Sequence, residues 1–421
     1  MGTVKELVRD RILSREGRDT WADAWGKAIT KLMDMAMERL AGRVVDIKKD
    51  TSTRTMEAAV VRRKKYIKPF VLTILLTLLA VGSTGCTQVR QNEDTEEEPS
   101  VYVESEFAPL QKVIVSQSEF TDQILPLSQV YMPLEEIEDF GGEIVGDHVI
   151  FRADQERMQK METERETLVS VLERYGVEVL MPRKLTEQER VLATDPNGPS
   201  HGNGLTNEFV RDPFIVIGEH VIESNFRKEY RRYEALTARD LFPEDCRYVA
   251  MPVADISNEE AGPFLEGGDV LVYNKQVFVG NSGYGSNSAG IKWLRNYLTP
   301  YGYEVIEVRL QGNILHLDCA LSLVREGLMI VCEESFADGI PETFQGWDRI
   351  KVSEDDAEHL AVNGLPVNPD VYITDIAFRD TIGQQLEEHG ITVEYLDFSA
   401  TRIEAGSMHC STQPILRKSD S

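Results

Sequence analysis

A repeated order of short strands and helices constrains the fold of this chain more than any other feature of its sequence. Between residues 101 and 421, short β-branched runs form apparent hairpins, and helical stretches and further strands follow them. Hairpins are expected at 214–222, 270–279 and 321–331, helices at 154–175, 291–298 and 380–389, and strands at 112–115, 177–180, 304–308 and 392–396. Because no clear linker divides this segment, the pattern predicts one large α/β domain built of similar units.

Charge is distributed unevenly along the chain. The formal net charge is −26, and residues 1–85 hold 17 basic and 10 acidic side chains, a net of +7, which leaves −33 for residues 86–421. An acidic body of this size repels a phosphate backbone, so nucleic-acid binding is not expected, whereas small cations are attracted. The basic run at 227–232 is accordingly expected to be a solvated helix face.

The first hundred residues have the features of an export signal followed by a tether. Five basic side chains lie within 62–68, an uncharged apolar run follows at 70–81, and small residues then lead to Cys86. The run is short for a membrane-spanning helix, and the Gly-Cys ending resembles the lipobox of bacterial lipoproteins. We therefore expect a lipoprotein-type signal peptide at 56–86, lipidation of Cys86 and an acidic tether at 87–100.

Two alternatives stay open for this region. A single-pass anchor would also give an exported domain tethered to a bacterial membrane, on its periplasmic or extracellular face. Residues 1–55 have apolar side chains at helical spacing and are either a mis-called start or a cytoplasmic extension.

Cysteine usage argues against a disulfide framework and against structural zinc. The five cysteines are scattered and contain no CxxC pair. One of them, Cys410, lies in a Gly/Ser-rich polar loop near the end of the chain, where a thiol is open to chemistry. Taken alone, this motif could be structural, and a catalytic role for Cys410 depends on the residues that accompany it.

Residues with the chemistry to support such a thiol occur in two other polar segments. A cysteine nucleophile needs a proton-transferring group, usually histidine, and the histidine needs an orienting carboxylate. His316 and Glu266 are candidates for these two groups. The surplus acids Asp212 and Asp318 are explained by a cationic substrate, because carboxylates bind the planar edges of a guanidinium through paired hydrogen bonds.

Together these segments resemble the guanidino-group-modifying enzymes of the amidinotransferase/arginine deiminase superfamily, and among them the glycine and inosamine-phosphate amidinotransferases. The resemblance extends over residues 101–421 and is carried by the ordered segments 209–218 (with Glu223 and 226–233 after it), 266–269, 316–318 and 408–412. It implies the pentein fold, an α/β propeller of ββαβ-type units with fivefold pseudosymmetry and the active site at its axis.

The resemblance also implies a role for each candidate residue. Cys410 would attack the guanidinium carbon, His316 would move protons, and Glu266 would orient His316. The implied substrate-binding residues are Asp212, Asp318 and Asn363. No cofactor and no metal are implied, because side chains supply the chemistry.

The implied activity is transfer of the amidino group of arginine, or of a similar guanidine, to an amine through an amidino-Cys410 intermediate. If water replaces the amine, the result is hydrolysis of the arginine deiminase type. A catalytically silent, lipid-anchored binding protein is the third hypothesis. The expected partners are a small guanidine and an amine acceptor, and the oligomeric state stays open. Residues 332–335 contain no basic side chain where some relatives bind the substrate carboxylate, so the resemblance supports a guanidinium more strongly than arginine itself.

Overall fold

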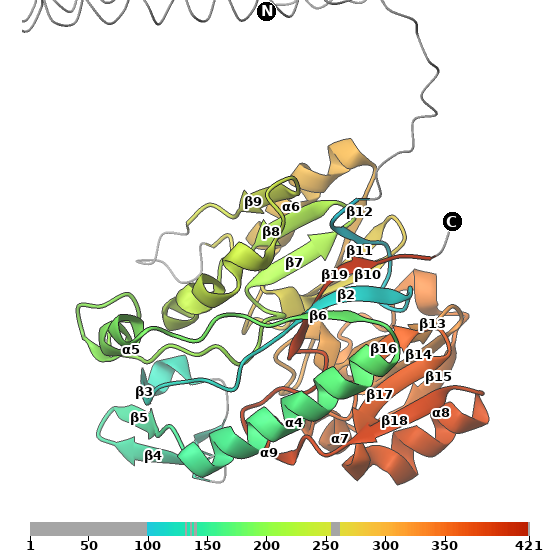
Figure 1. Cartoon of the computed structure of the whole chain (residues 1–421). Coiled ribbons are helices and arrows are strands. Elements are labelled where there is room, and N and C mark those ends of the chain that lie inside the picture. Colours follow the sequence, from blue (N-terminus) through green and yellow to red (C-terminus); the bar gives the residue numbers. More distant parts are fainter. Residues whose placement is uncertain (1–98, 131–132, 135–136, 139–140, 254–261, 420–421) are drawn as a thin grey trace, which may run out of the picture. The chain divides into compact units, whose positions relative to one another are not determined.

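The computed structural model describes residues 99–419 except 131–132, 135–136, 139–140 and 254–261 (Figure 1). The extension expected at 1–55, the signal expected at 56–86 with Cys86, and all but the last two residues of the tether lie outside the described residues. Within the described part of the chain, no helix is both long enough and apolar enough to cross a membrane.

Five sheets share one strand pattern, in which a third strand runs parallel to the second strand of an antiparallel pair. Four of these sheets follow one another along the chain. They are β7 (Phe214–Ile217), β8 (His220–Glu223) and β9 (Arg247–Ala250); β10 (Val270–Tyr273), β11 (Gln276–Asn281) and β12 (Glu304–Arg309); β13 (Leu321–Arg325), β14 (Leu328–Val331) and β15 (Asp348–Lys351); and β16 (Leu365–Asn368), β17 (Val371–Asp375) and β18 (Thr392–Leu396).

The fifth sheet joins the two ends of the domain. Its strands are β19 (Thr412–Arg417), β2 (Leu110–Val115) and β6 (Glu178–Leu180), with β1 (Tyr102–Val103) on the other edge of β19. The antiparallel pair of this sheet is therefore formed by strands from opposite ends of the described chain. This pairing fixes β19 and the loop before it, which carries Cys410, against the rest of the domain.

Helical connections lead to the parallel third strands, because a parallel pair cannot be joined by a tight turn. The main ones are α4 (Gln155–Arg174) before β6, α6 (Ser288–Leu298) before β12, and the π-helix η11 (Arg379–Gly383) with α8 (Gln384–Glu388) before β18. In the β7–β9 unit the 3-10 helix η3 (Glu229–Thr237) takes this place. The predicted α/β order of hairpin, helix and strand is thus present in successive units.

Apolar side chains fill the spaces between sheets and helices. Both strands β7 and β14 are buried along their whole length, which explains their continuous apolar sequences. Helix α4 packs through Leu168 and Leu172 onto a cluster that includes Val113 of β2 and Ile373 of β17, as its course across the domain in Figure 1 indicates.

The sequence patterns did not predict every element. A separate sheet of β3 (Gln123–Pro126), β5 (His148–Phe151) and β4 (Gly142–Val145) lies at one end of the domain (Figure 1). The remaining α-helices among the described residues are α5 (Glu187–Thr194), α7 (Glu354–Glu358) and α9 (Ser399–Arg402). Helix α9 lies just before the Cys410 loop and is held by α4.

The contact between α4 and α9 yields a test of stability. Buried Glu164 accepts hydrogen bonds from the backbone N–H groups of Ala400 and Thr401, both 2.9 Å, and from the Thr401 hydroxyl, 2.7 Å. Glu164→Ala leaves three donors unpaired and should lower the free energy of unfolding by about 3 kcal/mol or more. Urea denaturation measures the loss. Glu166→Ala, on the exposed side of α4, should change it by less than about 0.5 kcal/mol, and equal effects would contradict the assignment.

Candidate active site

The predicted site residues occupy the same place in all five units, directly before the first strand of each antiparallel pair. Asp212 precedes β7, Glu266 precedes β10, His316 precedes β13, Asn363 precedes β16 and Cys410 precedes β19. The repeated position explains how side chains from widely separated parts of the sequence come to lie together. Each of the five is buried.

His316 lies between two of the predicted carboxylates. Its Nε2 is 2.9 Å from Oε2 of Glu266, and its Nδ1 is 3.6 Å from Oδ1 of Asp212. The Gly-Gly sequence after Glu266 is required by this approach, because a Cβ atom at Gly268 would lie 2.6 Å from His316 Nδ1 and 2.8 Å from Asp212 Oδ1. The Gly pair therefore serves the site as well as the turn.

The surroundings of His316 favour its charged form. Burial opposes the positive charge, but the carboxylates of Asp212, Asp269 and Glu266 outweigh this effect and hold the pKa of His316 well above its usual value. Burial likewise opposes ionisation of Glu266, but its hydrogen bond with His316 outweighs this and lowers the pKa of Glu266. By contrast, burial raises the pKa of Asp269 to about 7. His316 and Glu266 therefore form a charged pair at neutral pH.

The surroundings of Cys410 in the same site favour its neutral thiol form. A hydrogen bond with the thiol of Cys319 lowers the pKa of Cys410, but burial and the carboxylates of Asp318 and Asp212 outweigh it, so the pKa lies above that of an ordinary thiol. The Cys410 sulfur lies 3.5 Å from Oδ2 of Asp318. A positive charge bound beside the sulfur would reverse this balance and favour the thiolate.

Asn363 holds the cysteine loop, which differs from its predicted contact with substrate. Its Oδ1 accepts hydrogen bonds from the backbone N–H groups of Ser407, 3.1 Å, and Cys410, 3.2 Å. Its Nδ2 donates to the backbone oxygen of Asp318 at 3.3 Å. With both ends of the amide used and no exposure of the side chain, Asn363 positions the nucleophile loop against the Asp318 segment.

Arg231 contradicts the prediction of a solvated basic helix face at 227–232. Its side chain is buried, and its Nη2 donates to Oδ2 of Asp212 at 2.7 Å. Its Nε donates to Oε1 of Glu234 at 2.8 Å, and its Nη1 lies 3.8 Å from Oε2 of Glu266. The acidic site needs a compensating cation, and η3 brings Arg231 into it.

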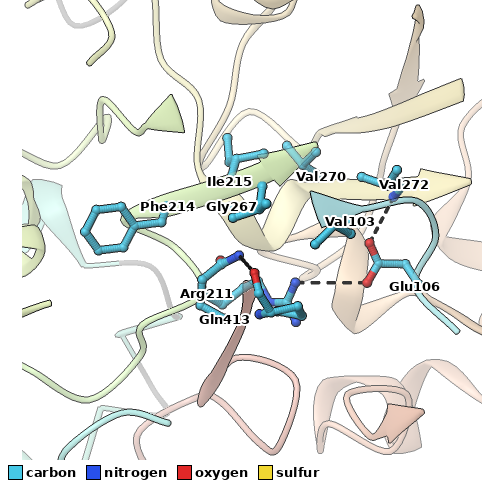
Figure 2. A pocket seen from close by; sticks show the side chains of 11 residues that line it. Val103, Glu106, Arg211, Phe214, Ile215, Gly267, Val270, Val272 and Gln413 are labelled. Atoms are coloured by element: carbon cyan, nitrogen blue, oxygen red, sulfur yellow. Dashed lines mark hydrogen bonds and ion pairs between the residues drawn. The ribbon is translucent and has the colours of Figure 1, made fainter. Parts of the chain in front are cut away.

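A second group of buried polar and charged side chains, formed by His409, Glu106 and Arg211, contacts the cysteine loop and Asp318. His409 Nδ1 lies 2.8 Å from Oδ2 of Asp318, and its Nε2 lies 3.3 Å from Oε2 of Glu106. Figure 2 shows Glu106 facing Arg211, with 4.0 Å between Oε2 and Nη1, and accepting a 2.9 Å hydrogen bond from the backbone of Val272. This chain of contacts fixes the carboxylate of Asp318, which lies next to the Cys410 sulfur.

The reactive groups open into one cavity of about 140 Å³. Asp212, His316 and Cys410 all line it, whereas Glu266, Asp318 and Asn363 are not among its described lining residues. The first three can therefore meet a ligand directly in this state of the site. The other three hold them in place.

Sequence reasoning missed three residues of this site: Arg231, His409 and Cys319. His409 and Cys319 stand next to Cys410 and Asp318 in the chain, so their closeness to the site was implicit in the motifs. Arg231 lies in the 226–233 segment of the resemblance, but its alternation with other charged residues is typical of a solvated surface, and this pattern led to the wrong interpretation.

The charged pair of His316 and Glu266 gives a prediction about pH. Glu266→Gln removes the negative partner and should lower the pKa of His316, which NMR titration of the imidazole would measure. Because the pKa is raised in the folded protein, the stability that His316 adds is complete below about pH 6.5 and is lost as the pH rises through the folded pKa. In the variant this loss should occur at lower pH. Glu388→Gln, on the exposed side of α8, is the control, and an unchanged His316 pKa in Glu266→Gln would refute the pairing.

Contact between the two thiols gives a second prediction. Cys319→Ala removes the hydrogen bond that lowers the pKa of Cys410, so alkylation of Cys410 by iodoacetamide should require higher pH. Mass spectrometry of the Cys410 peptide follows the rate at each pH. Cys246→Ala, outside the site, should leave the profile unchanged, and a profile that moves to lower pH in Cys319→Ala would contradict the assignment.

The chain is similar in sequence to a known family and to known amidinotransferases. The family model described as N,N dimethylarginine dimethylhydrolase, eukaryotic, matches residues 149–417, more than half of the chain. Inosamine-phosphate amidinotransferase 1 of Streptomyces griseus is 25% identical over 353 residues, which cover 75% of this chain and 97% of that protein. Mitochondrial glycine amidinotransferase of Danio rerio is 22% identical over 377 residues, which cover 77% of this chain and 85% of that protein.

Solved structures show the same fold. The inosamine-phosphate amidinotransferase of Streptomyces griseus superimposes with a TM-score of 0.63 at 21% identity, covering 76% of this chain and 97% of that one. The N-terminal domain of a cyanobacterial arginine dihydrolase gives a TM-score of 0.54 at 18% identity, covering 73% and 98%. The chain therefore belongs to the dimethylarginine dimethylhydrolase family, within the pentein superfamily of guanidino-group-modifying enzymes that also contains the amidinotransferases and arginine deiminases.

Proposed function

We propose that this protein is an amidinotransferase that moves the amidino group of a small guanidine to an amine through a covalent intermediate on Cys410. The observation that carries the proposal is the opening of Cys410, charged His316 and Asp212 into one cavity. The long alignments with amidinotransferases support the same reaction. We further propose that the five similar units are arranged with fivefold pseudosymmetry around this site.

The first half-reaction uses the charges of Asp212 and His316. A guanidinium bound at Asp212 brings positive charge to Cys410 and favours loss of the thiol proton to solvent, and the resulting thiolate attacks the central carbon. His316, already protonated, then donates its proton to the departing nitrogen, and an amine leaves. The amidino group stays bonded to sulfur as a thioether.

The second half-reaction reverses these roles. His316 is now neutral and takes a proton from the incoming amine, whose nitrogen attacks the amidino carbon. The carbon–sulfur bond breaks and the product guanidine is released. Cys410 is then a thiolate. Glu266 keeps the imidazole oriented in both steps, and Asp318, held by His409, is proposed to contact the guanidinium nitrogens once substrate is bound.

Hydrolysis is the second candidate reaction. The matching family model is that of a hydrolase, and an arginine dihydrolase shares the fold. Water in place of the amine would give a urea-type product from the same intermediate.

Turnover of the full chain distinguishes these reactions. Arginine and other alkylguanidines are incubated with and without a mixture of amines, and the products are identified by mass spectrometry. From arginine, ornithine with an amidinated amine indicates transfer, and citrulline alone indicates hydrolysis. Cys410→Ala should lower either rate by more than about 10³-fold, whereas Cys246→Ala should not.

A third outcome would overturn the proposed function. If no guanidine in the panel reacts and no amidino adduct forms on Cys410, the protein is a binding protein that has kept the fold.

We also propose that the protein is exported and anchored to a bacterial membrane through lipidated Cys86. The basic, apolar and small-residue order of 62–86 supports this proposal. Mass spectrometry of the mature amino terminus tests it, since lipidation predicts an acylated Cys86 at position one, and Cys86→Ser should release the protein from membranes.

A further inference from the structure

One carboxylate in the lining of the cavity lacks a close partner. The side chain of Glu208 is buried, with 4% of the residue exposed, and its Oε1 accepts no hydrogen bond from any described residue. Arg165 approaches this oxygen with Nη2 at 3.9 Å. The guanidinium of Arg165 instead donates to neutral oxygens, including the hydroxyls of Ser116 at 3.3 Å and Ser118 at 2.5 Å.

The other carboxylates that line the cavity are paired at short range. Asp212 and Glu234 both accept hydrogen bonds from Arg231. Oε1 of Glu404 also accepts no hydrogen bond from the described residues, but it lies 2.9 Å from Nε of Arg157, much closer to a cation than Oε1 of Glu208 does. Glu208 is therefore the cavity carboxylate whose charge is least compensated by the protein, and an uncompensated buried carboxylate is unfavourable.

Basic side chains are scarce around the cavity. Among the described lining residues, the one arginine or lysine is Arg231, which is engaged by carboxylates on two sides. A carboxylate carried by the ligand would thus meet further negative charge, whereas a second cation would be favoured.

We infer that Glu208 binds an ammonium group of the substrate at the end opposite the guanidinium, so that the preferred substrates are guanidines with a second cationic group and no carboxylate. This inference rests on the proposed function. Burial and the nearby charge of Glu404 raise the pKa of Glu208 well above its usual value, and a bound ammonium would favour its ionised form. The ammonium would supply the compensation that Arg165 and Arg157, which lie behind the lining, leave incomplete.

Four matched ligands test the assignment by calorimetry on the full chain carrying Cys410→Ala, which prevents turnover. Agmatine has a distal ammonium, arginine adds a carboxylate to it, 4-guanidinobutanoate has the carboxylate alone, and butylguanidine has neither. We expect agmatine to bind about 10- to 100-fold more tightly than butylguanidine, with 4-guanidinobutanoate weakest. Adding Glu208→Gln should reduce the preference for agmatine to less than about 3-fold, whereas adding exposed Glu166→Gln should preserve it.

Three results would overturn the subsite. They are a preference for agmatine that survives Glu208→Gln, binding of 4-guanidinobutanoate as tightly as agmatine, and no binding of any ligand. Glu208 could instead bind the ammonium of a separate acceptor amine. Butylamine added to the complex with butylguanidine tests this alternative, because binding of butylamine that depends on Glu208 would contradict the inference.

Turnover measured in parallel separates this inference from the proposed function. If the unmutated chain forms no adduct with any of the four guanidines, yet agmatine binds with the expected dependence on Glu208, the subsite stands and the proposed reaction fails. If adducts form at the same rate with and without the distal ammonium, and with and without Glu208, the proposed reaction stands and the subsite is refuted.

Discussion

Compensation of buried negative charge is the constraint on which the whole site depends. Glu266, Asp318 and Glu106 are almost fully buried, and each must meet a cation or several donors to remain ionised. His316 supplies positive charge beside Glu266, and His409 lies within hydrogen-bond distance of both Asp318 and Glu106. Each charge is therefore held by its neighbour, and the site behaves as one coupled group rather than as independent residues.

This coupling sets the resting state of the chemistry. The same carboxylates that favour protonated His316 also favour the thiol form of Cys410, so the protein residues alone provide an acid but not a thiolate nucleophile. A cationic ligand changes this balance, since it adds positive charge next to sulfur. Reactivity of the thiol is then tied to occupancy by a guanidinium, which protects Cys410 from other electrophiles in the absence of substrate.

Local sequence patterns predicted the repeated unit well, because each hairpin, helix and strand is specified by its own residues. The type of residue also identified Cys410, His316 and Glu266, since a thiol, an imidazole and a carboxylate form a recognisable chemical set. Arg231 and the true contacts of Asn363 could not be obtained in this way. Their positions depend on how η3 and the β16 unit pack against other units, and a sequence read segment by segment does not contain that information.

Charge also bears on the choice between an amine and water as the acceptor. An amine reaches the site as an ammonium and must lose a proton before it can attack. Water is already neutral when it reaches the site. The carboxylates around His316 raise its pKa, so once it has given its proton to the leaving group it is a stronger base than an ordinary imidazole. A base of raised pKa is better matched to an ammonium than an ordinary imidazole is, because the proton then moves between groups of more similar pKa. The arrangement that makes His316 a resting acid therefore also suits it to take a proton from an amine acceptor in the proposed second step.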